Sequence, residues 1–277
     1  KLLNYEADKN YNRLVVTIIG EPQKLKDAVF EAIGVAKDII DMNKHKGQHP
    51  RFGATDVCPF IPIKDMDMDD AIKLANELGE KVAKEYKIPV FSSQGTLQAL
   101  EETQQLNADV PAELVDSRGI ECAGMWISSF PTLHDCAEGI GFHITTADDR
   151  TLSFATDLGC MTEQVYHNLA GSDFVVLESN HDVGMLKTGN YPYILKQRII
   201  SDYGHLSNAA CADILPKLAK MGTARFLLAH LSHENNTPDI ALQTSLCSLT
   251  MEGLKRGLDY EIDIAPRENT KHGTILF

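Results

Sequence analysis

The stretch Ile88-Pro89-Val90-Phe91-Ser92-Ser93 decides how this chain folds, because two parts of different character meet there without a linker. Before it, apolar residues recur at helical spacing between short apolar runs. After it, β-branched runs alternate with turn residues, a pattern typical of hairpin sheet. The sequence therefore predicts a mixed α/β (α+β) chain in two parts, residues 1–91 and 92–277.

The first part predicts a small β-α-β-α-β layer with its helices on one face. Its opening run, NRLVVTIIG from Asn12 to Gly20, is continuously apolar and indicates a strand buried on both faces. Later, alternating apolar residues and two prolines predict an edge strand. The expected elements are a strand at 12–20, a helix at 25–40, the edge strand at 57–63, a helix at 71–82 with an acidic cap at 65–70, and a strand at 88–91.

The second part predicts strands first and alternating strands and helices afterwards. Its turn signals are Ser117-Arg118-Gly119 and Asp148-Asp149. The expected elements are a helix at 95–106, strands within 113–129 and 139–156, a buried strand at 173–178, helices at 193–200 and 208–219, a strand at 225–230 and a helix at 240–256.

Composition limits the classes of partner. The chain has 277 residues, of which 43% are hydrophobic, and a net charge of −13, which disfavours nucleic acid as an electrostatic partner. Six separated cysteines without a C-x-x-C motif indicate reduced thiols in a cytoplasmic protein. No apolar run reaches membrane-spanning length, and the start at Lys-Leu-Leu suggests that an upstream segment was removed or never captured.

A loop that carries a histidine and an arginine lies between the first helix and the edge strand. It reads GQHPRFGATDVCPF, from Gly47 to Phe60, and places His49 and Arg51 between two turn glycines. Loops held between regular elements often carry catalytic groups, although a solvated surface loop gives the same pattern. The loop is therefore a candidate site that depends on its surroundings.

The motifs of residues 1–91 resemble the amino-terminal subdomain of glutamate formimidoyltransferase. The resemblance implies transfer of a formimino group from N-formimino-L-glutamate to tetrahydrofolate, in histidine metabolism, with His49 as catalytic acid/base. Arg51 either orients a substrate carboxylate or braces the loop. The motifs are Asn12-Arg13, Gly20-Glu21-Pro22, Ile40-Asp41-Met42, Gly47-Gln48-His49-Pro50-Arg51 and Gly53-Ala54-Thr55-Asp56-Val57-Cys58-Pro59-Phe60-Ile61-Pro62.

The chemistry of formimino transfer suits a histidine. Attack of an amine on the amidine carbon gives a tetrahedral intermediate, whose glutamate nitrogen must be protonated before it leaves. An imidazole with a pKa of ~6.5 gives and takes protons near neutrality. The second subdomain, which the resemblance says supplies much of the folate cleft, does not follow in this sequence, so the transferase site is expected to be incomplete.

The second part, from about Pro89, resembles the later half of a metallo-β-lactamase-fold hydrolase of the cytoplasmic exonuclease-like kind. The resemblance implies half of an αββα sandwich in which His134, Asp157 and His230 are metal ligands. It leaves His205 and His181 as second-shell, substrate or structural groups. The motifs are Phe130-Pro131-Thr132-Leu133-His134-Asp135, Phe154-Ala155-Thr156-Asp157-Leu158-Gly159, Glu178-Ser179-Asn180-His181-Asp182, Gly204-His205-Leu206-Ser207-Asn208 and Leu228-Ala229-His230-Leu231-Ser232-His233-Glu234-Asn235-Asn236.

Imidazole and carboxylate ligands suit zinc or manganese. The family's early His-x-His-x-Asp-His motif supplies most ligands, and no His-x-His occurs in these 277 residues. A catalytic zinc normally has three protein ligands, so weak metal binding is expected. The pair His45 and His49 precedes Pro50 in a loop, and His233 lies on the same turn as His230, so neither replaces the missing motif.

Three hypotheses therefore remain open, and whether the chain is an enzyme is among them. The first is a formimidoyltransferase-like fragment acting on a small-molecule substrate with tetrahydrofolate as co-substrate. The second is a metal-dependent phosphodiesterase or nuclease, and it is the only one of the three hypotheses that includes a nucleic-acid partner. The third is an inactive chimeric fragment, whose open sheet edges favour pairing with another copy.

Overall fold

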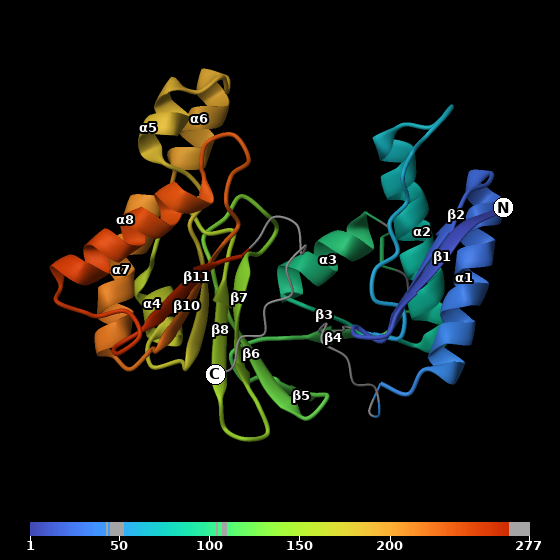
Figure 1. The fold of residues 1–277 in the computed structure, drawn as a ribbon, viewed down its shortest axis with the longest axis horizontal. Coiled ribbons are helices and arrows are strands. Elements are labelled where there is room, and N and C mark those ends of the chain that lie inside the picture. The colour runs from blue at the N-terminus through green and yellow to red at the C-terminus, as the bar shows by residue number, and fades with distance from the viewer. Residues whose placement is uncertain (43, 45–52, 104, 107–109, 266–277) are drawn as a thin grey trace. The chain divides into compact units, whose positions relative to one another are not determined.

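The computed structural model describes residues 1–42, 44, 53–103, 105–106 and 110–265. These residues form two compact units, which Figure 1 shows by the colour of the chain. The first contains Lys1–Val90 and the described part of 100–113, and the second contains Phe91–Ala99 and the described residues from Leu114 onward. The mixed α/β class predicted from the sequence is confirmed.

The first unit consists of a hairpin and two long helices. Strands β1 (Leu2–Asp8) and β2 (Arg13–Ile18) pair antiparallel, and helices α1 (Pro22–Ile39) and α2 (Met68–Tyr86) follow. Asp67 and Asp70 form a capping box at the start of α2, which satisfies two backbone N–H groups that have no partner inside the helix. An ion pair between Lys26 and Glu77 joins the two helices.

Three predictions for this unit are wrong. The order of elements is not β-α-β-α-β, because a hairpin of two strands precedes α1 and the described residues between α1 and α2 contain no strand. Strand β2 forms where expected, but it is not buried on both faces, because Val15 and Val16 are 50% and 51% exposed. The expected edge strand at 57–63 is irregular chain. Pro59 and Pro62 lack the N–H group that a strand donates, and the apolar alternation around them therefore marks no strand.

Two short strands, β3 (Val90–Ser92) and β4 (Ala112–Leu114), form a separate two-stranded sheet. Helix α3 (Gln94–Glu102) lies between them in the sequence and forms within the predicted 95–106 helix. The β3 strand falls at the stretch where the two sequence patterns meet.

A seven-stranded sheet is the centre of the second unit, in the order β11-β10-β9-β8-β7-β6-β5. Strands β8 to β11 run parallel, whereas β5 to β8 are joined by antiparallel pairs. The strands are β5 (Ile120–Cys122), β6 (Met125–Pro131), β7 (Ile140–Thr145), β8 (Thr151–Ala155), β9 (Phe174–Glu178), β10 (Arg225–Ala229) and β11 (Glu261–Ile264).

Helices pack against one face of this sheet and bury its core. Alternate strand residues, among them Val175, Leu177 and Phe226, join helix residues such as Val165 and Leu215 in one buried cluster. This sheet-and-helix pair of layers is the arrangement predicted for half of a sandwich. The helices of this cluster are α4 (Glu163–Leu169), α7 (Asn208–Lys220) and α8 (Pro238–Met251). Two further helices, α5 (Val183–Thr188) and α6 (Tyr193–Ile200), contribute none of its residues.

Two further properties bear on the sequence expectations. All six cysteines are free, and Cys211 is fully buried. Among the described residues, none of the helices combines the length and the apolar character needed to cross a membrane.

Candidate metal centre

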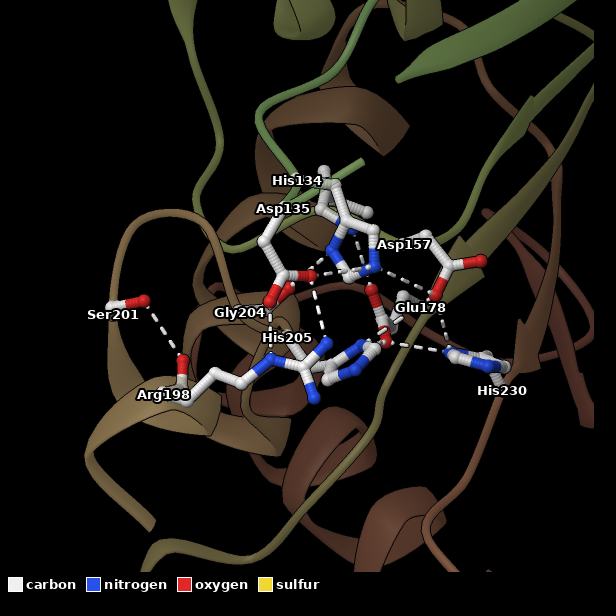
Figure 2. Close-up of polar contacts among 10 residues, drawn as sticks. His134, Asp135, Asp157, Glu178, Arg198, Ser201, Gly204, His205 and His230 are labelled. Carbon is white, nitrogen blue, oxygen red and sulfur yellow. Dashed lines mark hydrogen bonds and ion pairs between the residues drawn. The ribbon is translucent and has the colours of Figure 1, made fainter. Parts of the chain in front are cut away.

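Side chains capable of metal binding gather at one edge of the seven-stranded sheet. Asp157 follows β8, Glu178 ends β9 and His230 follows β10. These three strands are parallel neighbours, so their carboxyl ends meet at the same edge. His134 follows β6, which runs in the same direction as β8, and His205 lies just before α7. Figure 2 shows the five side chains converging.

Glu178 is the buried centre of the cluster. Its side chain is 0% exposed, and its Oε1 atom accepts hydrogen bonds of 2.8 Å from the Nδ1 atoms of both His205 and His230. Its other oxygen accepts a 2.9 Å hydrogen bond from the backbone N–H of Leu158. A buried carboxylate is stable only with such partners, so Glu178 fixes both rings and defines Nδ1 as the protonated nitrogen of each neutral imidazole.

Asp157 lies among three histidines without forming a hydrogen bond to any of them. Its Oδ1 atom is 3.7 Å from His134 Nε2, 3.7 Å from His205 Nδ1 and 3.6 Å from His230 Nδ1. Two ligand atoms each about 2.1 Å from one tetrahedral zinc ion are ~3.4 Å apart. Of these distances only the one to His134 Nε2 compares with this spacing, because the Nδ1 atoms of His205 and His230 donate to Glu178.

His134 has the orientation of a metal ligand. Its Nδ1 atom donates to the carbonyl of Gly204 over 3.0 Å, which leaves a lone pair on Nε2, 3.4 Å from Asp135 Oδ1 and 3.7 Å from Asp157 Oδ1. A side chain at position 204 would block this contact, because a Cβ atom there would lie 2.2 Å from the Arg198 carbonyl oxygen. Glycine is thus required for the close approach of this loop.

Two of the site residues have a strained backbone. Asp157 and His230 adopt φ angles of 54° and 57°, in the left-handed region that side chains with a Cβ atom rarely occupy. Such conformations cost on the order of 1–3 kcal/mol each and occur mainly at functional sites. The strain indicates that these two side chains are held at this edge by the surrounding contacts.

Local charges shift several pKa values. Burial alone raises the pKa of Glu178, but the hydrogen bonds from His205, His230 and Leu158 outweigh it and hold that pKa below its ordinary value. The hydrogen bond to Glu178 raises the pKa of His230. Nearby, the Arg198 guanidinium lowers the pKa of Asp135 to about 2 through a two-pronged ion pair.

The structure brings together all three metal ligands predicted from the sequence, His134, Asp157 and His230, and adds His205. Within the described residues, Asp157, Glu178, His205 and His230 offer ligand atoms that all lie within 4.8 Å of one another. His181 is 2% exposed, and burial lowers its pKa. Its ring is not part of this group.

The catalytic residue His49 and the substrate-binding residue Arg51 expected in the first unit lie outside the described residues. Glu178 was missed as a site residue, although its motif was recognised. A carboxylate that ends the apolar run DFVVLE was the available signal, because a buried charge at a strand end requires nearby partners.

The residues present fit a divalent cation. Carboxylate and imidazole groups are ligands that zinc and manganese accept, and the 3.7 Å between His134 Nε2 and Asp157 Oδ1 is close to the spacing of two ligands on one ion. The Asp157 and His230 side chains are 49% and 43% exposed, so an ion has access from solvent. The edge of the sheet therefore defines a class of protein, a hydrolase-like α/β unit with a candidate metal centre.

Comparisons with known proteins find two different families along the chain. Residues 1–110 match the family described as "Formiminotransferase domain, N-terminal subdomain". The glutamate formimidoyltransferase of Streptococcus pyogenes serotype M1 is 43% identical over 90 residues, which are 32% of this chain and 30% of that protein. The chain thus spans about 30% of the length of the formimidoyltransferases that it matches.

The larger match is to a nuclease. The exodeoxyribonuclease YycJ of Bacillus anthracis is 33% identical over 195 residues, which cover 69% of this chain and 72% of that protein. Among solved structures, the metallo-beta-lactamase fold protein YhfI from Bacillus subtilis shares 16% identity with a TM-score of 0.47, and the match covers 71% of this chain and 70% of that one. By its similarity to YycJ, the chain belongs to the exodeoxyribonuclease YycJ family.

Proposed function

We propose that the second unit hydrolyses phosphodiester bonds with the help of one divalent ion, zinc or manganese, held by His134, Asp157 and His230. The observation that supports this most strongly is the convergence of His134, Asp157 and His230 at one edge of the sheet, with His134 Nε2 3.7 Å from Asp157 Oδ1. Membership of a family that includes an exodeoxyribonuclease supports DNA as the substrate.

Each residue contributes a separate part of the chemistry. An ion at the site supplies a Lewis acid and an activated water. Glu178 orients His205 and His230 and keeps the Nδ1 atom of each ring protonated. With its Nδ1 atom donating to Glu178, the His205 ring offers Nε2 as the acceptor of a proton from the attacking water.

The overall negative charge agrees with this chemistry only if a cation is bound. Asp157 and Glu178 repel a phosphate group, and the net charge of −13 adds to that repulsion. A divalent ion reverses the local sign at the sheet edge. Phosphodiester binding should therefore depend on the ion, and weak ion binding should limit activity at low metal concentration.

The test is cleavage of a 5′-labelled single-stranded DNA by the full chain, with Mn²⁺ or Zn²⁺ varied over a wide range. Activity should require metal and should disappear in Asp157→Asn, which keeps the shape of the side chain and removes its charge. Lys220→Gln, a change of charge in the exposed Lys220–Glu252 ion pair, serves as the control and should retain activity. Metal-independent cleavage, or full activity in Asp157→Asn, contradicts the proposal.

A second function is supported by the first unit. The match to the formiminotransferase subdomain supports transfer of a formimino group from N-formimino-L-glutamate to tetrahydrofolate, with His49 as acid/base and Arg51 on a substrate carboxylate. The test is 5-formimino-tetrahydrofolate formation, followed by absorbance. Loss of the product in His49→Ala supports this function, and absence of any product in the unaltered chain excludes it for this chain alone.

A further inference from the structure

We propose that Asn180 is a positioning residue, whose side-chain amide holds His230 in the backbone conformation that brings its ring to Glu178. This role rests on the proposed metal centre and extends it to a residue whose side chain offers no ligand to the cluster. Asn180 lies two residues after Glu178 and is 7% exposed.

Asn180 connects the loops that carry both histidines. Its Nδ2 atom donates a 2.8 Å hydrogen bond to the carbonyl oxygen of His230. Its backbone N–H donates over 2.9 Å to the carbonyl of Leu206, next to His205, and its own carbonyl accepts a 2.7 Å bond from the N–H of Ser232. Asn180 thus joins the end of β9 by hydrogen bonds to the loop that carries His205 and to the loop that carries His230.

The bond to the His230 carbonyl matters because of the backbone at that position. His230 has a φ of 57° and directly follows Ala229, the last residue of β10, so its peptide turns away from the sheet ladder. A backbone carbonyl inside the protein that no longer accepts a hydrogen bond from a neighbouring strand needs another donor. Asn180 supplies that donor and so stabilises the left-handed backbone of His230.

Asn180 is itself fixed by a buried amide network. Asn236, 2% exposed, donates through Nδ2 to the carbonyls of Ser179 and Asn180 and to Oδ1 of Asn208, all within 2.8–2.9 Å. Asn208 is 1% exposed and accepts a further 2.7 Å bond from the Ser179 hydroxyl. These bonds leave Asn180 little freedom, so its amide is preorganised for the His230 carbonyl.

The decisive variant is Asn180→Asp in the full chain. It keeps the size of the side chain, removes the NH₂ donor and places a carboxylate oxygen against the His230 carbonyl. The first readout is the visible absorption of bound Co²⁺, a substitute for zinc that reports ligand geometry. The expected result is a changed spectrum and a Co²⁺ affinity lower by about 10- to 100-fold, the range for loss of a group that orients a metal ligand.

The second readout needs no metal. In the metal-free chain with ¹⁵N-labelled histidine, the Nδ1–H proton of His230 should resonate far downfield because it is bonded to Glu178. In Asn180→Asp this signal should move or disappear, since the ring is no longer held there. If Asn180→Asp does not fold, Asn180→Ser removes the same donor without adding a charge and is measured in the same way.

Two control variants separate positioning from general damage. Asn208→Asp makes the same chemical change in the same buried network, but the bond it loses is to Asn236 and not to His230, so it should lower stability and alter both signals less than Asn180→Asp does. Asn190→Asp adds the charge at an exposed position and should change neither.

The outcomes distinguish this role from the proposed function. If the unaltered chain binds Co²⁺ and Asn180→Asp binds it with the same spectrum and affinity, the positioning role is wrong. If the unaltered chain binds no Co²⁺, the metal centre is wrong, and the histidine signal still decides whether Asn180 holds His230. Equal effects of Asn180→Asp and Asn208→Asp on both signals also contradict the specific role.

Discussion

At the scale of single residues, the site depends on one buried carboxylate. Glu178 accepts three hydrogen bonds and is completely shielded from solvent. Replacing one partner of a buried charged pair is costly because the other partner keeps its desolvation penalty without compensation. The stability of the second unit should therefore respond to this residue more than to the exposed ion pairs.

We predict that Glu178→Gln lowers the free energy of unfolding of the metal-free chain by about 1–3 kcal/mol. The loss should depend on pH. Because the pKa of Glu178 is lowered from 4.5, its contribution is present above pH 4.5 and is lost as the pH falls through the folded-state value. Because the pKa of His230 is raised from 6.5, its contribution is present below pH 6.5 and is lost as the pH rises through the folded-state value.

The difference between the unaltered chain and Glu178→Gln should thus be largest between pH 4.5 and 6.5 and should narrow on either side. Urea unfolding followed by circular dichroism across this range measures it. A difference that stays constant with pH would show that the two groups do not interact in the folded chain.

Gly204 gives a second prediction at this scale. A methyl group there meets the carbonyl oxygens of Arg198 and Ile199 at 2.2 and 2.3 Å, which forces the backbone to move. Gly204→Ala should cost on the order of 1–3 kcal/mol and disturb the bond from His134 to the Gly204 carbonyl. Thermal melting measures this loss of stability. Gly79→Ala is a suitable control, because no atom lies within 4 Å of a Cβ atom added there. Gly222→Ala is not, because the positive φ of Gly222 would itself be strained by a side chain.

The resemblance predicts His134, Asp157 and His230 as metal ligands, and the structure places both histidines near Asp157, while their binding of a metal stays a prediction. Two features were beyond the sequence. The role of Glu178 depends on two rings that approach from loops 27 and 52 residues away. The left-handed backbone of Asp157 and His230 was also not predictable, because the usual sequence signal for such a position is glycine and neither residue is glycine.

At the scale of elements, the parallel strands β8, β9 and β10 together form the site, because a site residue lies at the carboxyl end of each, on the same edge of the sheet. Asp173 fixes the opposite end of two of them. Its carboxylate accepts bonds from the backbone N–H and hydroxyl of Thr151 at 2.8 and 3.0 Å, and from Arg150 at 2.8 Å. The register of β8 against β9 starts from this contact.

We predict that Asp173→Asn lowers stability by about 1 kcal/mol at neutral pH, since the carboxylate exchanges a charged acceptor for a neutral amide. The hydrogen bond from the Thr151 backbone N–H is the main cause of the lowered pKa of Asp173. Its contribution is therefore present above pH 3.8 and is lost as the pH falls through the folded-state value. Chemical unfolding at pH 7 and pH 3 should show the two proteins converging at the lower pH, whereas a gap that widens on acidification would contradict the assignment.

Element prediction succeeded where periodicity and boundary signals agreed. The helix at 193–200 and the strand at 225–230 match α6 and β10 closely, and α2 begins at its acidic cap. The edge strand predicted at 57–63 does not form, because Pro59 and Pro62 lack N–H donors that even an edge strand uses. Short elements such as α4 and β11 were not foreseen, since four to seven residues give too little periodicity to recognise.

At the scale of the whole molecule, the two units differ in how much apolar surface they bury. Helix α1 has no buried residue, and α2 buries Ala71, Leu74 and Leu78. The second unit has one continuous buried cluster that joins five strands to three helices. Because stability scales with buried apolar area, the first unit should be the weaker.

Hydrogen exchange followed by mass spectrometry tests this difference in the intact chain. Amides of α1 and α2 should exchange through low-energy opening, faster than those of β9, β10 and α7 by several orders of magnitude. Equal protection across both units would show that they unfold as one cooperative body.

Whether the two units were joined by evolution or by an accident of sequence assembly bears on the first unit's activity more than on the second. The chain covers 72% of the YycJ nuclease but about 30% of the formimidoyltransferases that it matches. A single long sequencing read across the codons for residues 85–98 distinguishes a real fusion from an assembly error. The metal centre can be tested on this chain in either case.

The most direct test of the metal centre is a crystal of the full chain grown with zinc and measured above and below the zinc absorption edge. The proposal predicts an anomalous peak bonded to His134 Nε2, Asp157 Oδ1 and a nitrogen of His230, with Glu178 still accepting a hydrogen bond from His205. A peak elsewhere on the chain, or none at this edge with Asp157 still 3.6–3.7 Å from the histidines, would contradict it.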